Sequence, residues 1–336
     1  MSDRFATSVA NLGVENRHSV LANFPDVLAK GSDPEVTVTG TRLAAQAVRG
    51  CLEKSDLPTR SIGLVLGVST SPGRLLPGLA NDLFTALPEI PRSAVPLNLA
   101  YMGCSALPKA VETARWYLTS NPDRTVLMSF MDSNTPLNRP FEAMCLHFSE
   151  GGPQQDTVDA VNAFLFGDAA VAMLMTAEGD GSQFGPVTHL TNVRPEDAEL
   201  GTIPDGGSDA PIVHGRKTVT RTRDVPARGL YYATKAVRDL LAREDCALSS
   251  PQDAARLLMH TGSRRILDVL CDELGVPTDG EQTAIAYQVL RHYGNTLSSS
   301  VPLMVGAQGG LPPGESLLVT FGMGFSAGAT TLHVPA

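Results

Sequence analysis

The stretch Asn98-Leu99-Ala100-Tyr101-Met102-Gly103-Cys104-Ser105-Ala106-Leu107-Pro108 places a cysteine where a strand gives way to a helix. Residues 94–100 are mostly apolar and predict a buried strand, and the residues after Cys104 repeat apolar side chains at helical spacing. Unpaired N–H groups and the positive dipole end at a helix start stabilise an anion, so they favour a reactive thiolate and an acyl oxyanion beside it. A buried cysteine is also a common packing residue, so this stretch alone leaves both interpretations open.

Composition narrows the class of protein. The chain has 336 residues, 43% of them hydrophobic, enough to bury a large core in two domains or in one large domain of two similar halves. The formal net charge of −9 and the lack of a dense Lys/Arg run argue against nucleic acid or an anionic membrane as the main partner. No apolar run reaches the ~18 residues of a membrane span and no signal-peptide pattern is present, so we expect a soluble, cytoplasmic protein.

The cysteines indicate neither a disulfide framework nor a zinc site. They are odd in number and widely spaced, and no two form a Cys-x-x-Cys pair, so we expect no metal. Apart from Cys104, we expect Cys51, Cys246 and Cys271 to pack on helix faces. The five cysteines stand at positions 51, 104, 145, 246 and 271.

Alternating apolar and helical segments predict an α/β fold with a mostly parallel sheet covered by helices. Thr41 is a candidate cap for the first of these helices. Residues 132–163 form an excursion from the alternation, of the kind that often lines a site or a subunit contact. A polar connection at 194–228 separates two halves of the chain. The expected helices are 41–55, 79–87 and the one that starts at Cys104, and the expected strands are 62–68, 94–100, 125–130 and 165–175.

The second half of the chain resembles the first. An offset of 189 residues carries the helical segment 47–52 onto a similar segment, and carries Cys104 to within two residues of Asn295, where an apolar helix begins. The repeat therefore predicts halves of residues 1–193 and 194–336. It also predicts that Cys104 and Asn295 occupy corresponding helix starts.

A histidine and an asparagine complete a chemical set with the cysteine. His260 ends an apolar strand at 256–260 and precedes a helix at 265–274, which places it at the same carboxyl edge of the sheet as Cys104. The thiol can attack an acyl group, and the imidazole can take its proton or help to stabilise the thiolate. His260 and Asn295 together can donate hydrogen bonds to an enolate or oxyanion. A structural role is the alternative for each, and for Asn295 capping its helix does not exclude catalysis.

Three further stretches follow the cysteine in chain order. They are Phe166-Gly167-Asp168-Ala169-Ala170, Tyr293-Gly294-Asn295-Thr296-Leu297-Ser298-Ser299-Ser300-Val301-Pro302-Leu303 and Phe321-Gly322-Met323-Gly324-Phe325-Ser326-Ala327-Gly328. They resemble the Phe-Gly-Asp-Gly-Ala segment, the Gly-Asn-Thr-Ser stretch and the glycine loop of the thiolase-fold condensing enzymes. The branch most similar contains β-ketoacyl-acyl-carrier-protein synthase III and the chalcone synthase-like type III polyketide synthases. Within the first stretch, we expect Asp168 to satisfy backbone donors.

The resemblance spans residues 13 to 334 and implies a fold and a site. The implied fold is a thiolase-like α/β fold with two pseudo-repeated βαβαβαββ halves in a five-layer αβαβα arrangement. Cys104 would accept the acyl group, while His260 and Asn295 would assist malonyl decarboxylation. Gly322, Met323 and Gly324 would shape the oxyanion site with the Cys104 N–H. No cofactor is implied, the substrates would be thioesters of coenzyme A or of an acyl carrier protein, and the protein would be a homodimer.

Departures from the family bear on the substrate. Thr7 and Asn11 stand where bacterial initiating synthases carry a tryptophan and an arginine that grip coenzyme A. Arg139 is a candidate for a second nucleotide-contacting arginine, with a solvated loop arginine as the alternative. Thr261-Gly262-Ser263, after the histidine, is nearer to the polyketide synthase pattern than to that of the fatty-acid enzymes. We therefore expect an enzyme of specialised polyketide or fatty-acyl-derived metabolism.

Three functions remain open at this point. The leading one is decarboxylative Claisen condensation of an acyl group on Cys104 with a malonyl thioester. The alternative keeps the acyl-enzyme but passes the acyl group to an alcohol or amine without decarboxylation. The third, a non-catalytic partner subunit, gives no reason to keep the cysteine, the histidine and the asparagine together.

Overall fold

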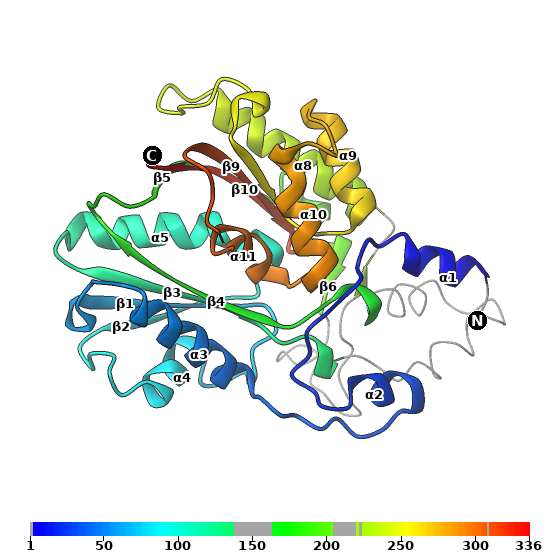
Figure 1. Ribbon diagram of the computed structural model, residues 1–336, viewed down its shortest axis with the longest axis horizontal. Coiled ribbons are helices and arrows are strands. Elements are labelled where there is room, and N and C mark those ends of the chain that lie inside the picture. Colours follow the sequence, from blue (N-terminus) through cyan, green and yellow to red (C-terminus); the bar gives the residue numbers. More distant parts are fainter. Residues whose placement is uncertain (1–2, 138–162, 204–219, 222–223, 308) are drawn as a thin grey trace.

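Two mixed β-sheets organise the chain (Figure 1). The structure is a computed structural model and describes residues 3–137, 163–203, 220–221, 224–307 and 309–336. The first sheet has the strand order β2-β1-β3-β4 and the second has the order β5-β10-β9-β8. The strands are β1 (Ile62–Ser69), β2 (Val95–Ala100), β3 (Thr125–Asp132), β4 (Ala169–Thr176), β5 (Gln183–Thr191), β8 (Arg256–Met259), β9 (Gly314–Gly322) and β10 (Ser326–Val334), with a small separate pair formed by β6 (Gly201–Thr202) and β7 (Thr220–Arg221).

The expected parallel pairing holds for most of the first sheet only. There β1 runs parallel to β2 and β3, while β4 is antiparallel to β3. In the second sheet β8 and β9 are parallel, but β10 is antiparallel to both β9 and β5. The short loop between β9 and β10 explains this correction, because a tight connection joins antiparallel neighbours and a parallel pair needs a long crossover.

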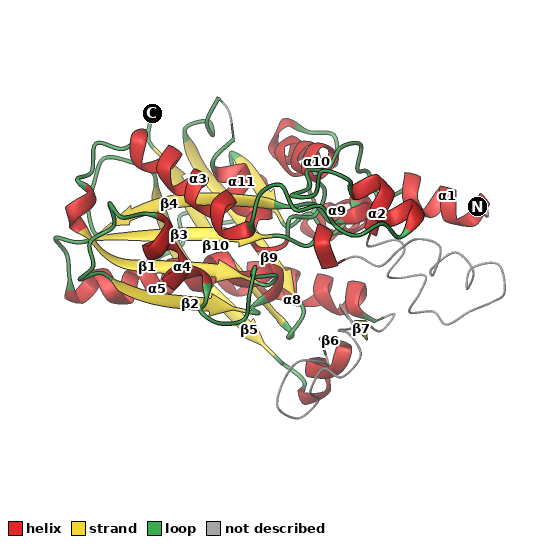
Figure 2. Cartoon of the chain, turned by 90° about the horizontal axis from the view of Figure 1, so that it is seen from below, coloured by secondary structure: helices red, strands yellow, loops and turns green. Residues whose placement is uncertain are grey.

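The helices separate and cover the sheets. Helices α3 and α4 cover the outer face of the first sheet, α5 and α11 lie between the two sheets, and α8 covers the outer face of the second (Figure 1). This is the five-layer αβαβα arrangement expected from the resemblance. Figure 2 shows α1 and α2 beyond one end of the sheets. The helices are α1 (Asp3–Ala10), α2 (Phe24–Lys30), α3 (Gly40–Glu53), α4 (Leu79–Ala86), α5 (Ala106–Ser120), α8 (Val225–Leu241), α9 (Arg264–Leu274), α10 (Glu281–Tyr293) and α11 (Ser300–Val305).

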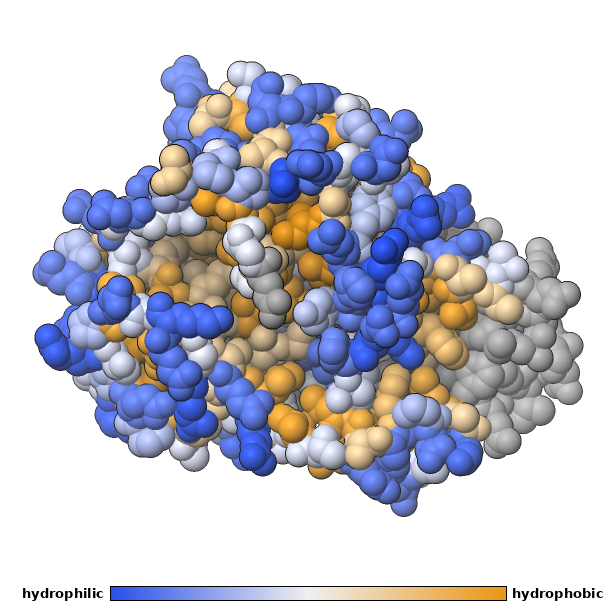
Figure 3. All heavy atoms as spheres, viewed as in Figure 1, coloured by the Kyte–Doolittle hydropathy of each residue, from blue (hydrophilic) through white to orange (hydrophobic). Residues whose placement is uncertain are grey.

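The apolar runs of the central strands follow from burial on both faces. On β1, Leu64, Leu66 and Val68 pack in the core cluster that contains the buried face of α5, whereas Val65 packs in the cluster of α3 and α4. A strand covered on both sides has no polar face, so its sequence is continuously apolar rather than alternating. On the face seen in Figure 3, hydrophobic residues also gather in the middle of the molecule around α11.

The cap of α3 differs from the prediction. The N-cap is Thr39, two residues before Thr41. With φ −71° and ψ 152°, its side chain accepts a hydrogen bond from Arg42 N–H. Thr41 lies inside the helix and donates its hydroxyl to Asp82 at 3.2 Å. Both threonines can accept from a backbone N–H, but only the one with extended backbone before the first turn is placed to do so.

The internal repeat is visible in the pairing of the strands. The offset of 189 residues carries β3 onto 314–321, which is β9. In the first sheet β1 pairs parallel with β3, and β3 pairs antiparallel with β4. In the second sheet β8 pairs parallel with β9 in the same way, and β9 pairs antiparallel with β10. The division at residues 193 and 194 stays a prediction as a statement about domains. The strand pairing puts the change of sheet before residue 193. The chain passes from the first sheet to the second between β4 and β5, because β5 pairs with β10.

Two strands differ from the sequence prediction. β2 is an edge strand and is not buried in the single chain, with Val95 53% exposed and Leu97 40% exposed. The prediction of a buried strand was wrong because an apolar run does not reveal whether both neighbouring strand positions are filled. β4 begins at Ala169 rather than at Leu165, since Phe166 forms an isolated parallel bridge with Asn295 instead.

The described cysteines and helices bear on two other predictions. No disulfide links two of the four cysteines that the structure describes, and Cys145 lies outside the described residues. Cys51 on α3 and Cys271 on α9 lie on helices as expected, but Cys246 follows the end of α8 and is not on a helix. Within the described ranges no helix is long and apolar enough to cross a membrane, and no three His, Cys, Asp or Glu side chains are grouped to hold a metal ion.

Candidate active site

Cys104 lies at the predicted strand-to-helix turn. β2 ends at Ala100, the 3₁₀ helix η2 (Gly103–Ser105) carries the cysteine, and α5 follows directly. The chain reverses sharply there, with φ 59° at Tyr101 and φ 58° at Gly103. Cys104 is half-buried. The side chain therefore stands ahead of the first turn of a 15-residue helix, where unpaired N–H groups favour negative charge.

The glycine loop after β9 lies directly against this turn. A Cβ atom on Gly322 would lie 2.5 Å from the backbone nitrogen of Cys104, and one on Gly103 would lie 3.0 Å from the carbonyl oxygen of Met323. Asn192 holds the loop, since its Oδ1 accepts from Phe325 N–H at 2.7 Å and its own N–H donates to Phe325 O at 2.9 Å. The expected oxyanion segment is thus in backbone contact with the turn of the nucleophile, and its role there stays a prediction.

His260 and Asn295 lie side by side. The imidazole Nε2 is 3.5 Å from the carboxamide Nδ2, and the two residues are 3% and 4% exposed. His260 follows β8 and donates its backbone N–H to Val319 O on β9. Asn295 is fixed by backbone hydrogen bonds to Leu165 and Gly167, which close the bridge at Phe166. The structure therefore brings together two predicted residues that are 35 positions apart in the chain.

The carboxamide of Asn295 bonds to the backbone ahead of the next helix and still faces the histidine. Asn295 is not the cap that the sequence alternative expected, because the N-cap of that helix is Thr296. The Asn295 Oδ1 accepts from Leu297 N–H at 2.9 Å, at the start of the short helix η6 (Leu297–Ser299). This bond fixes the orientation of the amide, so Nδ2 is the group that faces His260. The two polar atoms of this side chain thus have different neighbours, and the catalytic role of Asn295 stays a prediction.

His260 is uncharged near neutral pH. Burial lowers its pKa to about 3, and its ring packs edge-on against Phe321 with centroids 5.4 Å apart. Its Nδ1 has no hydrogen-bond partner among the residues that the structure describes. An imidazole with this pKa is a weak base and carries no positive charge for a thiolate. Its Nε2, when protonated, and the Asn295 Nδ2 instead form two adjacent donors for an oxygen placed between them.

A buried carboxylate that could not be identified from the sequence connects the first sheet to the segment after Asn295. Asp132, 0% exposed at the end of β3, accepts from the backbone N–H groups of Thr70 at 2.7 Å, Ser71 at 2.8 Å and Ser298 at 2.8 Å. Burial raises the pKa of Asp132, while these hydrogen bonds oppose the rise. Because Ser298 is on η6, three residues after Asn295, the carboxylate connects the first sheet to the segment that carries the asparagine. Helix η6 in turn contacts η2.

Asp168 has the structural role that was expected. Its carboxylate accepts from the backbone N–H groups of Val20 at 2.9 Å, Asn134 at 2.7 Å and Thr135 at 2.9 Å. Burial raises its pKa, and these hydrogen bonds work against that rise. The Gly167-Asp168 stretch therefore fixes the approach to the Asn295 bridge. Arg139, the candidate nucleotide contact, lies outside the described residues.

Comparisons with known proteins agree with this fold and this resemblance. Residues 246–334 match the family described as 3-oxoacyl-acyl-carrier-protein synthase III, C terminal. The β-ketoacyl-acyl-carrier-protein synthase III of Nitratidesulfovibrio vulgaris (strain Miyazaki F) is 28% identical over 302 residues, which cover 86% of this chain and 82% of that protein.

Two solved structures have the same fold. The 3-oxoacyl-(acyl-carrier protein) synthase from Burkholderia xenovorans LB400 superposes with a TM-score of 0.73 at 21% identity, covering 98% of this chain and 86% of that one. The 1,3,6,8-tetrahydroxynaphthalene synthase from Streptomyces coelicolor A3(2), a bacterial type III polyketide synthase, superposes with a TM-score of 0.76 at 20% identity, covering 99% and 90%. The chain therefore has the thiolase fold of these solved structures, and its sequence is similar to the β-ketoacyl-acyl-carrier-protein synthase III of Nitratidesulfovibrio vulgaris over most of its length.

Proposed function

We propose that this protein is a condensing enzyme that loads an acyl group onto Cys104 and joins it to a malonyl thioester by decarboxylative Claisen chemistry. The observation that carries the proposal is the convergence of three segments. Cys104 stands in a turn that contacts η6, the glycine loop lies against the same turn, and the nitrogens of His260 and Asn295 lie 3.5 Å apart. The relatives named above are synthases that work with an acyl carrier protein or make polyketides, which is the same reaction class.

The loading step uses the turn and the glycine loop. The Cys104 thiolate attacks the thioester carbonyl of the donor, and the negative charge on the carbonyl oxygen is stabilised by N–H groups such as that of Cys104. The carbonyl re-forms as the carbon–sulfur bond to the donor thiol breaks, which leaves an acyl group on Cys104. The thiolate needs no positive charge from His260 in this step, since the helix start already favours the anion.

The condensing step uses the two donors. The carboxylate of the malonyl thioester leaves as carbon dioxide, and its bonding electrons form an enolate whose oxygen accepts from Nε2–H of His260 and Nδ2–H of Asn295. A neutral donor pair stabilises charge that develops in the transition state, whereas a charged imidazolium would also bind the ground-state carboxylate. The enolate carbon attacks the acyl carbonyl, and the Cys104 thiolate departs.

The alternative acceptor is an alcohol or amine, which would take the acyl group without decarboxylation. His260 would then have to remove the proton of the acceptor. Its low pKa makes it a poor base for that task, so the structure favours condensation.

The donor, the metabolic role and the assembly are parts of the same proposal. We propose that coenzyme A or an acyl carrier protein carries the acyl group, without a bound cofactor, in specialised metabolism in the cytoplasm. We also propose a homodimer that pairs through β2. This strand is an edge strand, and its apolar side chains Val95 and Leu97 are exposed in the single chain. Unpaired edges with apolar side chains associate readily with another strand.

Intact-mass spectrometry tests the loading step. The protein is mixed with a panel of acyl-coenzyme A and acyl-carrier-protein thioesters, and the mass gain of one acyl group is measured for the wild type, Cys104→Ala and Cys51→Ala. Cys51, a half-buried cysteine on α3, is the matched control. We expect the adduct on the wild type and on Cys51→Ala and its absence on Cys104→Ala. No adduct with any donor, or an adduct that survives Cys104→Ala, would contradict the proposal.

A further inference from the structure

A lysine that the proposed mechanism does not use lies one turn after the nucleophile. Lys109, in the first turns of α5, donates from its Nζ to Ser105 Oγ at 2.7 Å, Ser326 Oγ at 3.0 Å and Ser105 O at 3.3 Å. The two serine hydroxyls are themselves 2.6 Å apart, and these serines are 0% and 4% exposed. The ammonium group therefore closes a buried polar cluster made of three side chains.

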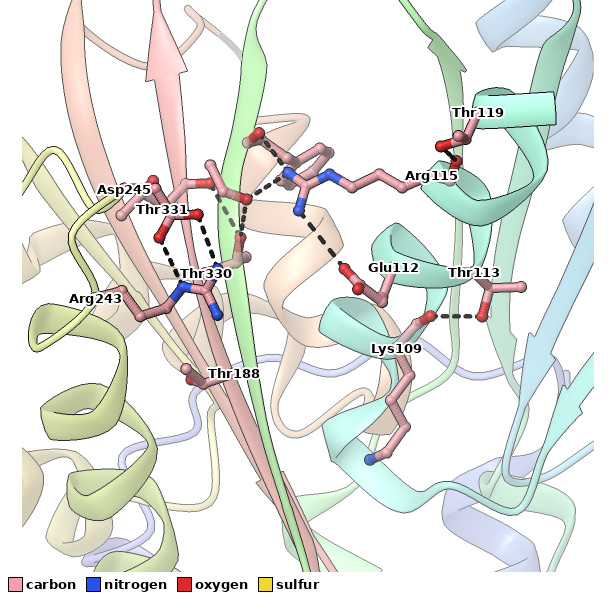
Figure 4. A network of polar contacts seen from close by, with 12 residues as sticks. Lys109, Glu112, Thr113, Arg115, Thr119, Thr188, Arg243, Asp245, Thr330 and Thr331 are labelled. Carbon is pink, nitrogen blue, oxygen red and sulfur yellow. Dashed lines mark hydrogen bonds and ion pairs between the residues drawn. The ribbon is translucent and has the colours of Figure 1, made fainter. Parts of the chain in front are cut away.

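The charge of Lys109 is not neutralised by the acid next to it. Glu112 on the same helix pairs with Arg115 at 3.7 Å, and Figure 4 shows the ammonium of Lys109 pointing away from both. Among the residues that the structure describes, no carboxylate lies within 4.0 Å of Nζ. The other titratable group that faces it is His189 on β5, whose pKa is lowered by burial and also by Lys109. Burial lowers the pKa of Lys109 itself to about 8.

The cluster joins two segments that are far apart in the sequence. Ser105 directly follows Cys104, and Ser326 begins β10, four residues after Gly322. Lys109 therefore bridges the turn of the nucleophile and the end of the glycine loop. Between the same two segments, a Cβ on Gly322 would lie 2.5 Å from Cys104 N. A shift of the loop by a fraction of that distance would change where the N–H groups around Cys104 point.

We propose that Lys109 is a positioning residue that fixes the glycine loop against the Cys104 turn and so keeps the N–H groups of the oxyanion site in place. The inference rests on the proposed function, because it assigns the oxyanion site to acyl loading. A half-buried lysine without an acid partner is unfavourable unless hydrogen bonds compensate the burial of its charge, and Lys109 has such bonds to both serines. Here they hold the two backbone segments that would meet the acyl oxygen.

Acyl loading and alkylation of the Cys104 thiol can distinguish a positioning role of Lys109 from a direct effect of its charge on the thiol. Loading from a thioester passes through a tetrahedral oxyanion and depends on the placement of N–H donors. Alkylation by iodoacetamide displaces iodide at a saturated carbon and forms no oxyanion, so its rate reports the thiolate alone. A change in loading without a change in alkylation is therefore the signature of a displaced oxyanion site.

The test compares Lys109→Met with wild type and with Lys235→Met. Lys235 on α8 pairs with Asp239 at 2.8 Å on the surface and is the matched control. We expect Lys109→Met to slow acyl loading by roughly ten- to a hundredfold, the usual effect of misplacing a catalytic group by a fraction of an ångström to about 1 Å. Alkylation of Cys104 should stay within about twofold of wild type. Lys235→Met should change neither rate.

Other outcomes overturn the inference. Unchanged loading in Lys109→Met refutes positioning, and an equal fall in loading and alkylation shows that the charge acts on the thiol instead. Ser326→Ala removes the anchor on the loop side and should produce the same selective loss. If Lys109→Met does not fold, as judged by circular dichroism, Ser326→Ala decides the question. A wild type that loads no thioester refutes the proposed function, whereas a wild type that loads beside an equally active Lys109→Met refutes only this inference.

Discussion

The charge state of His260 makes the most quantitative prediction. Burial lowers its pKa to about 3, whereas an imidazole in the unfolded chain has its ordinary value of about 6.5. Between these two values the unfolded chain binds a proton that the native protein does not bind. The histidine therefore destabilises the native state as the pH falls below about 6.5, and this effect grows until the pH reaches about 3.

The size of the effect follows from the proton linkage. Each pH unit in this range changes the free energy of unfolding by about 1.4 kcal/mol per differential proton. Between about pH 7 and about pH 5 the histidine accordingly removes about 2 kcal/mol of stability. The variant His260→Gln has no titrating group at this position. Relative to wild type, it should therefore gain about 2 kcal/mol on going from about pH 7 to about pH 5, whatever its stability at pH 7.

Urea unfolding of both proteins at the two pH values, at equal protein concentration, measures this difference. Other titrating groups cancel because only the change in the difference is used. His292→Gln, which removes an exposed imidazole from α10, is the control and should follow the wild type. A difference between wild type and His260→Gln that stays constant with pH would refute the argument that the buried imidazole is uncharged.

Three further predictions test the packing around the site. Asp132→Asn should lower the free energy of unfolding by about 3 kcal/mol in urea unfolding, because a carboxamide cannot accept from all the N–H groups that converge on the carboxylate. An unchanged free energy of unfolding would contradict the claim that these hydrogen bonds connect the first sheet to η6. Gly322→Ala should lower acyl loading by roughly a hundredfold in the mass assay while Gly50→Ala, which has open space for a Cβ, loads normally; equal loading would contradict the close contact with Cys104. Leu97→Lys should convert the proposed dimer to a monomer in size-exclusion chromatography with light scattering, and Leu57→Lys, which also replaces an exposed leucine, should not; a dimer that persists in Leu97→Lys would contradict pairing through β2.

The elements around Cys104 could be predicted because their signals are local. An apolar run, a glycine and a helical repeat of apolar residues lie within about twenty positions, and the structure has the strand, the turn and α5 where these signals place them. The same holds for His260, which follows directly after a short apolar strand. His260 was expected near Asn295 from its place at the sheet edge and from the family resemblance, and the structure places their side-chain nitrogens 3.5 Å apart.

The features that were missed depend on residues distant in the sequence. Asp132 reads as the last residue of an apolar strand, and its donors come from segments 61 to 166 positions away. Lys109 reads as a solvated helix residue, because its partner Ser326 is 217 positions away. The exposure of β2 could not be predicted for a related reason, since the position of a strand within a sheet is decided by which other strands pair with it.

The most direct test of the central claim follows the carbon atoms. Wild-type protein carrying an acyl group on Cys104 is mixed with a malonyl thioester labelled in its free carboxylate, and released carbon dioxide and remaining acyl-enzyme are measured together. The account predicts one labelled carbon dioxide for each acyl group that leaves Cys104, with a product two carbons longer than the acyl group. Transfer of the acyl group to an added alcohol or amine without release of labelled carbon dioxide would contradict it.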